Sequence, residues 1–210
     1  MKKLQSLLTS LGRHDPGTFE HCQNVALLMS KWAQNIATSA ADIHKAYVCG
    51  LVHDIGKLNI PGDLLTKPGP LTDQEWKIIK SHPDCGSELI ANVCGLDEIS
   101  PIILFHHERY DGNGYGRGLK STSIPLFSRM VAICDAFDAM TSKRAYNRHI
   151  ITRQALDEII RCAGSQFDPW LCQSFISLTT RDNEMRVKPL EGLALYVLHH
   201  HERWDGAGLP

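Results

Sequence analysis

The segment His53-Asp54-Ile55-Gly56-Lys57 sets the organisation of this chain, because it places an imidazole and a carboxylate side by side at the end of a predicted helix. Adjacent side chains on a helix point about 100° apart, so such a pair can bind one metal ion only where the helix ends or bends. We expect Gly56 to end the helix as a left-handed C-terminal cap, which leaves Lys57 on the following loop, free to reach whatever the metal holds. For a lone His-Asp pair, a chance dipeptide at a solvated helix end is the plainer alternative, and the rest of the sequence argues against it.

Length and composition indicate one compact unit of the size of an enzyme. The chain has 210 residues, 43% of them hydrophobic, which is enough for one domain, or for one domain with a short extension. The formal net charge of -1 and the pI near 6.8 argue against binding to long nucleic acid but leave room for a local anion pocket. Seven cysteines, spread singly without C-x-x-C spacing, predict reduced core residues in a cytoplasmic protein. No long apolar run follows the N-terminus, so we expect neither an export signal nor a transmembrane span.

Helical periodicity predicts an all-α fold, a compact bundle with no strands. Thr72 and Glu75 form a capping box, and Pro83 breaks the chain just after His82, so that His82 should point into a cleft between two helices. The chain after Lys57 should be an extended linker. We expect the helices at about residues 4–11, 18–37, 42–53, 72–82, 83–93, 99–108, 125–140 and 152–162, with a last one capped by residues 167–170.

Seven candidate metal ligands lie at the ends or on the inward faces of these helices. For any one histidine, such as His21, a buried ring bonded to a backbone carbonyl is the plainer alternative. Together, however, mixed imidazole and carboxylate ligands suit a divalent ion such as iron(II), manganese or zinc, and seven are too many for one ion. Two ions about 3.5 to 4 Å apart would bind the oxygens of a phosphodiester and lower the pKa of a bridging water, which predicts phosphoester hydrolysis. The seven candidates are His21, His53, Asp54, His82, His106, His107 and Asp135.

A loop with four glycines in seven residues runs from Gly112 to Gly118 and holds Tyr115. Glycine at this density indicates tight turns or a close approach of the backbone to a ligand, although a merely flexible surface loop is the alternative. A basic segment, residues 142–149, follows the helix that carries Asp135.

The chain resembles the HD-GYP phosphodiesterases, a branch of the HD-domain metal-dependent phosphohydrolases. The resemblance covers roughly residues 17–178, and such an ordered set of motifs is very specific. It rests on segments 53–57, 60–61, 67–71, 106–112, 135–139 and 167–169.

The resemblance implies hydrolysis of cyclic di-GMP to a linear dinucleotide, pGpG, and in some members onward to GMP. It implies that the seven candidates are metal ligands and that Asp54 bridges the two ions. Lys57 would contact the scissile phosphate and stabilise its charge or help to protonate the leaving oxygen. Tyr115 would pack against a guanine or the sugar-phosphate, and Arg144 would pair with the non-scissile phosphate. Arg148 is a further substrate-binding candidate.

Three positions depart from the family's pattern. Gly116 replaces the proline of the Gly-Tyr-Pro motif, so the loop loses a fixed φ angle and gains freedom. Gly17 stands where members with three metals carry a glutamate, so we expect two metals here, with Glu20 as a nearby substitute left open. Asn147 stands where many members have a basic residue, and Arg148 is the residue that would compensate.

Residues 200–210 repeat the pattern of residues 106–115. We therefore divide the chain into a phosphohydrolase domain, residues 1–180, and a C-terminal extension, residues 181–210. No second His-Asp pair accompanies the repeat, so it cannot build a second site alone. It is a remnant of a duplicated domain, a segment that packs near the active site or on a second subunit, or a tolerated tail.

Three classes of function stay open. The leading class is a cyclic di-GMP phosphodiesterase, the second is an HD-type hydrolase of another nucleotide, and the third is a non-catalytic signalling module that docks diguanylate cyclases. We expect iron or manganese first, with nickel, zinc or magnesium as alternatives, since imidazole and carboxylate bind all of these ions and do not separate them. A homodimer is compatible with the sequence, which does not decide it.

Overall fold

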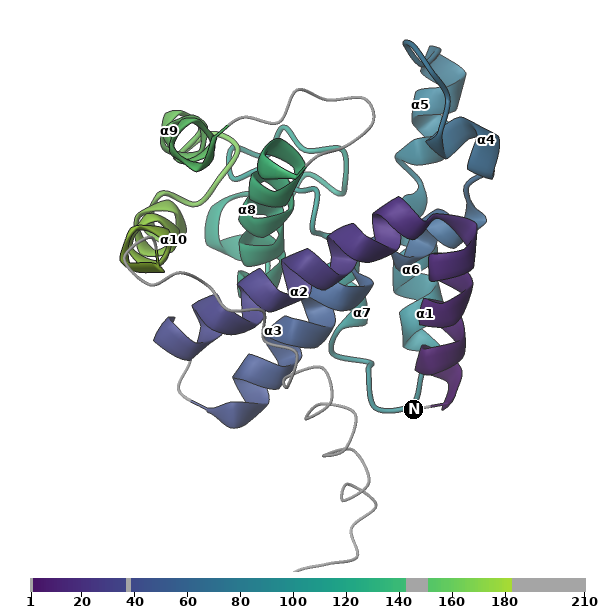
Figure 1. The fold of residues 1–210 in the computed structure, drawn as a ribbon, viewed down its shortest axis with the longest axis horizontal. Helices are drawn as coiled ribbons and strands as arrows, with labels where there is room; N and C mark the ends of the chain where they lie inside the picture. Colours follow the sequence, from purple (N-terminus) through teal and green to yellow (C-terminus); the bar gives the residue numbers. More distant parts are fainter. Residues whose placement is uncertain (1, 37–38, 143–150, 183–210) are drawn as a thin grey trace, which may run out of the picture.

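The computed structural model describes residues 2–36, 39–142 and 151–182, and helices joined by turns and loops make up this part of the chain (Figure 1). The all-helical prediction is confirmed, since the described residues form no strand beyond one isolated bridge between Ala163 and Phe167. No helix in this part of the chain is long and apolar enough to cross a membrane. The helices are α1 (Lys2–His14), α2 (Pro16–Ile36), α3 (Ala40–Val52), η1 (Ile55–Asn59, a 3₁₀ helix), α4 (Gly62–Leu65), α5 (Asp73–Ile79), α6 (His82–Ala91), α7 (Ser100–Leu104), η2 (Ser121–Ser123, a 3₁₀ helix), α8 (Leu126–Thr141), α9 (Thr152–Arg161) and α10 (Pro169–Asp182).

The long helix α2 is the centre of the bundle, and α1, α3 and α8 pack against it (Figure 1). It lies closest to α3, where a Cβ atom on Gly50 would come within 2.6 Å of the Ala26 Cα, so that only glycine fits. At the other end of α2, the fully buried ring of Trp32 meets Phe175 of α10 edge to face, with centroids 5.0 Å apart. The core therefore runs the length of α2.

Local capping chemistry starts the helices where the sequence predicts it. The Thr72 hydroxyl accepts from the Glu75 N–H, and the Glu75 carboxylate accepts from the Thr72 N–H, which completes the predicted capping box of α5. Asp168 caps α10 by accepting from the backbone N–H groups of Trp170 and Leu171. Both predicted caps are confirmed.

The pair α4 and α5 stands away from the bundle beyond the end of α6 (Figure 1). No residue of either helix is buried. The aromatic side chain of α5 faces solvent, since Trp76 is 47% exposed. This arm is held at its two ends rather than by a core of its own.

The prediction for Gly56 as a left-handed helix cap is wrong. Gly56 lies within η1 and has no positive φ angle. Glycine is required here by a close approach, because a Cβ atom would lie 1.9 Å from the His82 carbonyl oxygen and 2.5 Å from the Gly86 N. The extended linker expected after Lys57 begins later than predicted, because Leu58 and Asn59 still belong to η1 and Ile60 is the first extended residue.

Two further helix predictions are wrong in their bounds. The helix expected to carry His106 and His107 ends at Leu104, so both histidines lie on the turn that follows α7. The first helix continues past Gly12 to His14. Periodicity locates an apolar face but is a weak guide to helix ends, which depend on tertiary contacts.

Candidate metal centre

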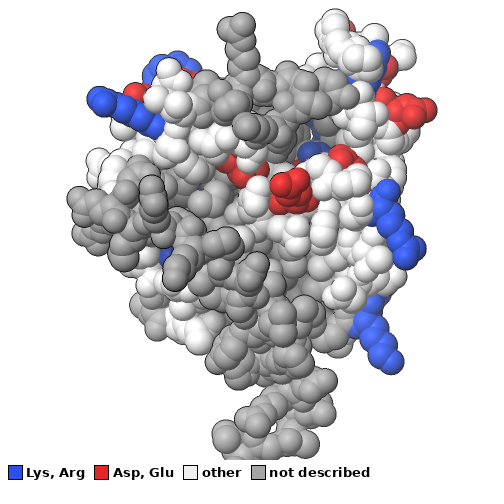
Figure 2. All heavy atoms as spheres, viewed as in Figure 1, with Lys and Arg blue, Asp and Glu red and all other residues white. Residues whose placement is uncertain are grey.

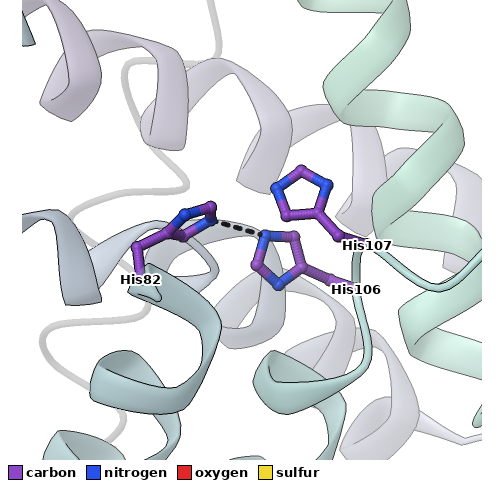
Figure 3. Close-up of side chains that lie close together, drawn as sticks. All are labelled: His82, His106 and His107. Atoms are coloured by element: carbon purple, nitrogen blue, oxygen red, sulfur yellow. Dashed lines mark hydrogen bonds between the residues drawn. The ribbon is translucent and has the colours of Figure 1, made fainter. Parts of the chain in front are cut away.

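The structure brings all seven predicted ligands to one place. Nitrogen atoms of His82, His106 and His107 form one group, and ligand atoms of His21, His53 and Asp54 form a second, each with its atoms within 4.8 Å of one another. In Figure 3 the three rings of the first group converge on one point, with His82 reaching in from α6. The seventh residue, Asp135, joins the second group through its Oδ1, 2.9 Å from the His21 Nε2.

Asp54 belongs to the second group and also contacts the first. One carboxylate oxygen, Oδ1, is 3.2 Å from the His82 Nε2, and the other, Oδ2, is 3.5 Å from the His53 Nε2. A carboxylate that presents one oxygen to each group has the placement of a bridging ligand. The side chain is 96% buried, so water does not replace these contacts.

Three of the histidines are held in the same way. Each ring places its Nδ1 against the backbone carbonyl three residues earlier, at 2.6 to 2.8 Å. Because a carbonyl only accepts, Nδ1 must carry the hydrogen, and the lone pair of the neutral ring is then on Nε2, which faces the site. The pairs are His53 with Gly50, His82 with Ile79, and His106 with Ile103.

This arrangement fits a bound cation. The Nε2 of His53 is buried and has no hydrogen-bond partner. The Nε2 atoms of His82 and His106 face each other at 3.3 Å (Figure 3), and two lone pairs at that distance repel unless a cation lies beside them. A divalent ion would satisfy all three nitrogens, so the chemistry of the donor set is that of a metal site.

Burial keeps most of the imidazoles in the form that binds metal. It lowers the pKa of His53, His82 and His106, and it lowers the pKa of His107 to about 4. For Asp54, burial alone would raise the pKa, but the charges of Lys57 and the neighbouring histidines outweigh it and hold the pKa well below its usual value. Neutral rings and an ionised carboxylate are therefore present together at neutral pH.

His21 is held differently, by a carboxylate that sequence reasoning left without a role. Its Nδ1 lies 2.6 Å from the Asp138 Oδ2, while its Nε2 faces Asp135. Burial lowers the pKa of His21, but hydrogen bonds to Asp135 and Asp138 outweigh burial and raise it to about 9. The only sequence signal was that Asp138 shares a helix face with Asp135, three residues earlier.

The prediction that Lys57 lies free on a loop is wrong. Its Nζ donates to the Asp54 Oδ2 at 2.6 Å from within η1. Burial lowers the pKa of this amine, but the Asp54 carboxylate outweighs burial and raises it. The ammonium is thus fixed at the edge of the centre with its charge retained.

The glycine loop is built from tight turns and close approaches. Gly112 and Gly118 have positive φ angles, and a Cβ atom on Gly114 would lie 2.7 Å from the Glu108 Cα. A Cβ atom on Gly116 would meet the buried carboxylate of Glu108 at 2.4 Å, so the glycine in the proline position makes room for that group. The backbone N–H of Arg117 donates to the same carboxylate, which anchors the loop.

The loop places Tyr115 beside the first group of histidines. Its ring lies 4.7 Å from the ring of His107, and 39% of the side chain is exposed. Seen from the same side as Figure 1, acidic and basic atoms meet at a hollow between the bundle and the lobe that holds α4 and α5 (Figure 2). A ligand of the centre would have Tyr115 as a wall.

Some predicted residues are not placed with these ligands. Arg144 and Arg148 lie outside the described residues, as does the repeat at 200–210. Gly17 and Glu20 are both exposed on α2, and Glu20 belongs to neither ligand group.

Comparison with known proteins gives one family match and several relatives. The family model described as "HD domain" matches residues 6–171. A protein of Thermotoga maritima named cyclic di-GMP phosphodiesterase is 36% identical over 166 residues, which is 78% of this chain and 45% of that protein. A protein of Vibrio cholerae named 3'3'-cGAMP-specific phosphodiesterase 1 is 40% identical over 129 residues, 61% of this chain and 30% of that protein. The chain thus spans less than half the length of either relative.

Two solved structures share the fold. A cyclic GMP-AMP specific phosphodiesterase of V. cholerae superposes with a TM-score of 0.67 at 18% identity, covering 92% of this chain and 51% of that one. The HD domain of an L. monocytogenes phosphodiesterase, solved with cyclic di-AMP, gives a TM-score of 0.64 at 21% identity, covering 87% of this chain and 98% of that one. At these identities the likeness shows the fold alone.

Proposed function

The chain belongs to the HD domain family, and from that premise we propose that it hydrolyses a phosphodiester bond of a cyclic dinucleotide, with cyclic di-GMP as the leading substrate. The observation that carries the proposal is the contact of the Asp54 carboxylate with both groups of ligand atoms, through one oxygen each. The curated relatives named for cyclic di-GMP support the choice of substrate.

The family implies divalent metal ions, and we propose two of them. One would be held by His82, His106 and His107, the other by His21, His53 and Asp135, with Asp54 shared. Iron or manganese is the leading proposal, and nickel, zinc and magnesium are the alternatives, because imidazole and carboxylate bind all of these ions. Two such ions supply Lewis acidity and an activated water at a phosphodiester.

Asp54 and Lys57 are the proposed catalytic residues. Asp54 holds the two halves of the centre in register, since its two oxygens contact different groups. Lys57 holds its proton on Nζ at the edge of the centre, where it can stabilise charge on the scissile phosphate or donate the proton to the leaving oxygen. Its hydrogen bond to Asp54 fixes the ammonium before substrate arrives, which reduces the cost of ordering it.

The proposed substrate contacts lie at the rim of the centre. Tyr115, beside His107, would pack on a guanine or on the sugar-phosphate. Arg144 would pair with the non-scissile phosphate, and Arg148 would assist it. For both arginines the proposal rests on the sequence, because they lie outside the described residues.

Hydrolysis of another cyclic dinucleotide is the second candidate. The relative that is 40% identical is named for 3'3'-cGAMP, which differs from cyclic di-GMP in one base. Metal ligands report the reaction more reliably than the base, so the centre serves either substrate. The third class is a signalling module that docks diguanylate cyclases. Such a module would have no use for a set of buried metal ligands, whose burial costs free energy.

The extension at 181–210 is proposed to act outside the centre, on a second subunit or near the substrate. Activity and oligomeric state that do not change on deletion of residues 183–210 would dispose of both versions. We also propose that the protein acts in the cytoplasm, and a homodimer is compatible with this proposal.

Metal analysis paired with an assay tests the function. Protein purified without air should contain about two metals per chain and convert cyclic di-GMP to a linear product seen by chromatography. Asp54→Ala should lose both metals and lower turnover at least about 1,000-fold, because it removes the shared ligand. Asp63→Ala, an exposed carboxylate on α4, is the matched control and should behave as the wild type. Full metal content in Asp54→Ala would show that the bridging role is wrong.

A further inference from the structure

A row of aromatic and cationic side chains leads from the metal centre to the exposed face of α5. The ring of Tyr115 lies 4.7 Å from His107. The Nζ of Lys80 lies near two rings, 5.3 Å from the centroid of Tyr115 and 5.8 Å from the centroid of Trp76. Lys80 therefore links the ring beside the metal ligands to a tryptophan on the outer arm.

The geometry of α5 explains why these groups share a side. Trp76 and Lys80 are four residues apart at the end of one helix, which puts them on the same face, one turn apart. Two residues later the chain reaches His82, the first residue of α6. The arm thus presents its tryptophan and lysine along the approach to the centre rather than on an unrelated surface.

Packing does not account for Trp76. No residue of α5 is buried, and nearly half of the Trp76 side chain is open to solvent. It lines an open groove of about 450 Å³ together with Asp73, Lys77 and Lys80. Within the described part of the chain, Lys80 contacts two rings and forms no ion pair with a carboxylate. An indole beside two ammonium groups has the chemistry of a site for a flat base that carries a phosphate.

We propose that Trp76 and Lys80 form a nucleotide subsite beside the metal centre, in which the indole stacks on the purine remote from the scissile bond and the ammonium pairs with a phosphate oxygen. This proposal rests on the proposed function and adds to it the place of the second nucleotide. A cyclic dinucleotide has two purines on one ring, so a nucleotide held at the centre beside Tyr115 must leave the other purine outside it. Trp76 offers an exposed aromatic ring for that second purine, and the Nζ of Lys80 lies near both this ring and the ring of Tyr115.

The subsite makes a prediction that a purely structural role would not. Trp76→Ala should lower kcat/KM for cyclic di-GMP about ten-fold, mainly through KM, since base stacking on an aromatic ring contributes this much per base. For bis(p-nitrophenyl) phosphate, a phosphodiester without purine or ribose, this ten-fold loss of kcat/KM should be absent. Lys80→Met should raise KM for cyclic di-GMP, and Lys80→Arg, which keeps the charge, should restore most of it.

Trp170→Ala is the matched control, because Trp170 is 61% exposed on α10 and should leave both substrates unaffected. A wild-type KM for cyclic di-GMP in Trp76→Ala, or an equal loss for both substrates, would overturn the subsite. Wild-type protein that cleaves bis(p-nitrophenyl) phosphate but neither cyclic di-GMP nor 3'3'-cGAMP would instead overturn the proposed substrate, so the two failures are distinguishable.

Discussion

Replacing Gly56 by alanine should separate η1, which directly follows Asp54, from α6, which begins at His82. A Cβ atom at this position would lie 1.9 Å from the His82 carbonyl oxygen and 2.5 Å from the Gly86 N, and both are backbone atoms that no rotamer change can move. Real Cβ contacts essentially never fall below 3.0 Å, so η1 and α6 must part by about 1 Å. The Nε2 of His82 would then move away from the Asp54 Oδ1, now 3.2 Å distant.

The magnitude follows from the cost of overpacking. Forcing extra volume into a packed contact costs about 1 to 3 kcal/mol, slightly offset because alanine restricts the unfolded chain more than glycine does. A loss of about 2 kcal/mol lowers the melting temperature of a domain this size by about 4 to 8 °C. Metal affinity should fall at least about ten-fold, because His82 and Asp54 would no longer lie close enough to bind the same ion.

Thermal unfolding followed by circular dichroism and metal analysis of the same samples would measure both effects. Gly62→Ala is the control, since the nearest atom to its added Cβ is 3.9 Å away, and it should stay within about 0.5 kcal/mol of the wild type. A Gly56→Ala protein that melts at the wild-type temperature with full metal content would refute the close-approach argument.

Two more predictions concern His21. Asp138→Asn should weaken metal binding about 10- to 100-fold, because the amide cannot hold the imidazole as the carboxylate does; competition with a fluorescent chelator measures this, and unchanged affinity would contradict the role of Asp138. In metal-free protein, Asp135 and Asp138 raise the pKa of His21 from 6.5 to about 9, so the protonated ring stabilises the fold. This contribution to the free energy of unfolding, about 3 kcal/mol, is complete below pH 6.5 and is lost as pH rises through 9. The pKa of His107 is lowered to about 4, so its contribution to stability is present above pH 6.5 and lost as pH falls toward 4. The free energy of unfolding of chelator-treated protein, measured with urea, should therefore be highest near pH 6.5. A flat profile from pH 6.5 to 9 would contradict this account.

The residues of the candidate centre could be predicted because their chemistry is rare in combination. Five histidines and two aspartates at helix boundaries left few explanations, and the structure brings all seven together. The all-helical class was equally accessible, since period-3.6 patterning recurs along the chain and the capping box at Thr72 is a local signal.

Contacts between distant segments could not be predicted in the same way. The reason for glycine at position 56 is a backbone 26 residues away at His82, which no local pattern reveals. The role of Asp138 depends on its distance to His21, 117 residues earlier in the chain. Gly116 likewise meets the Glu108 carboxylate, so its absence of a side chain serves packing as well as backbone freedom.

The carbonyl contacts of the three histidines tie the candidate centre to local unfolding of the backbone. Gly50, Ile79 and Ile103 lie in the last turns of α3, α5 and α7, where carbonyl oxygens lack the N–H donor four residues later that they would have inside a helix. The imidazoles that turn their Nε2 atoms to the centre therefore also close three helix ends. Fraying of any one end would release a ligand, and an ion that holds the ligands would slow amide hydrogen exchange in three separated segments at once.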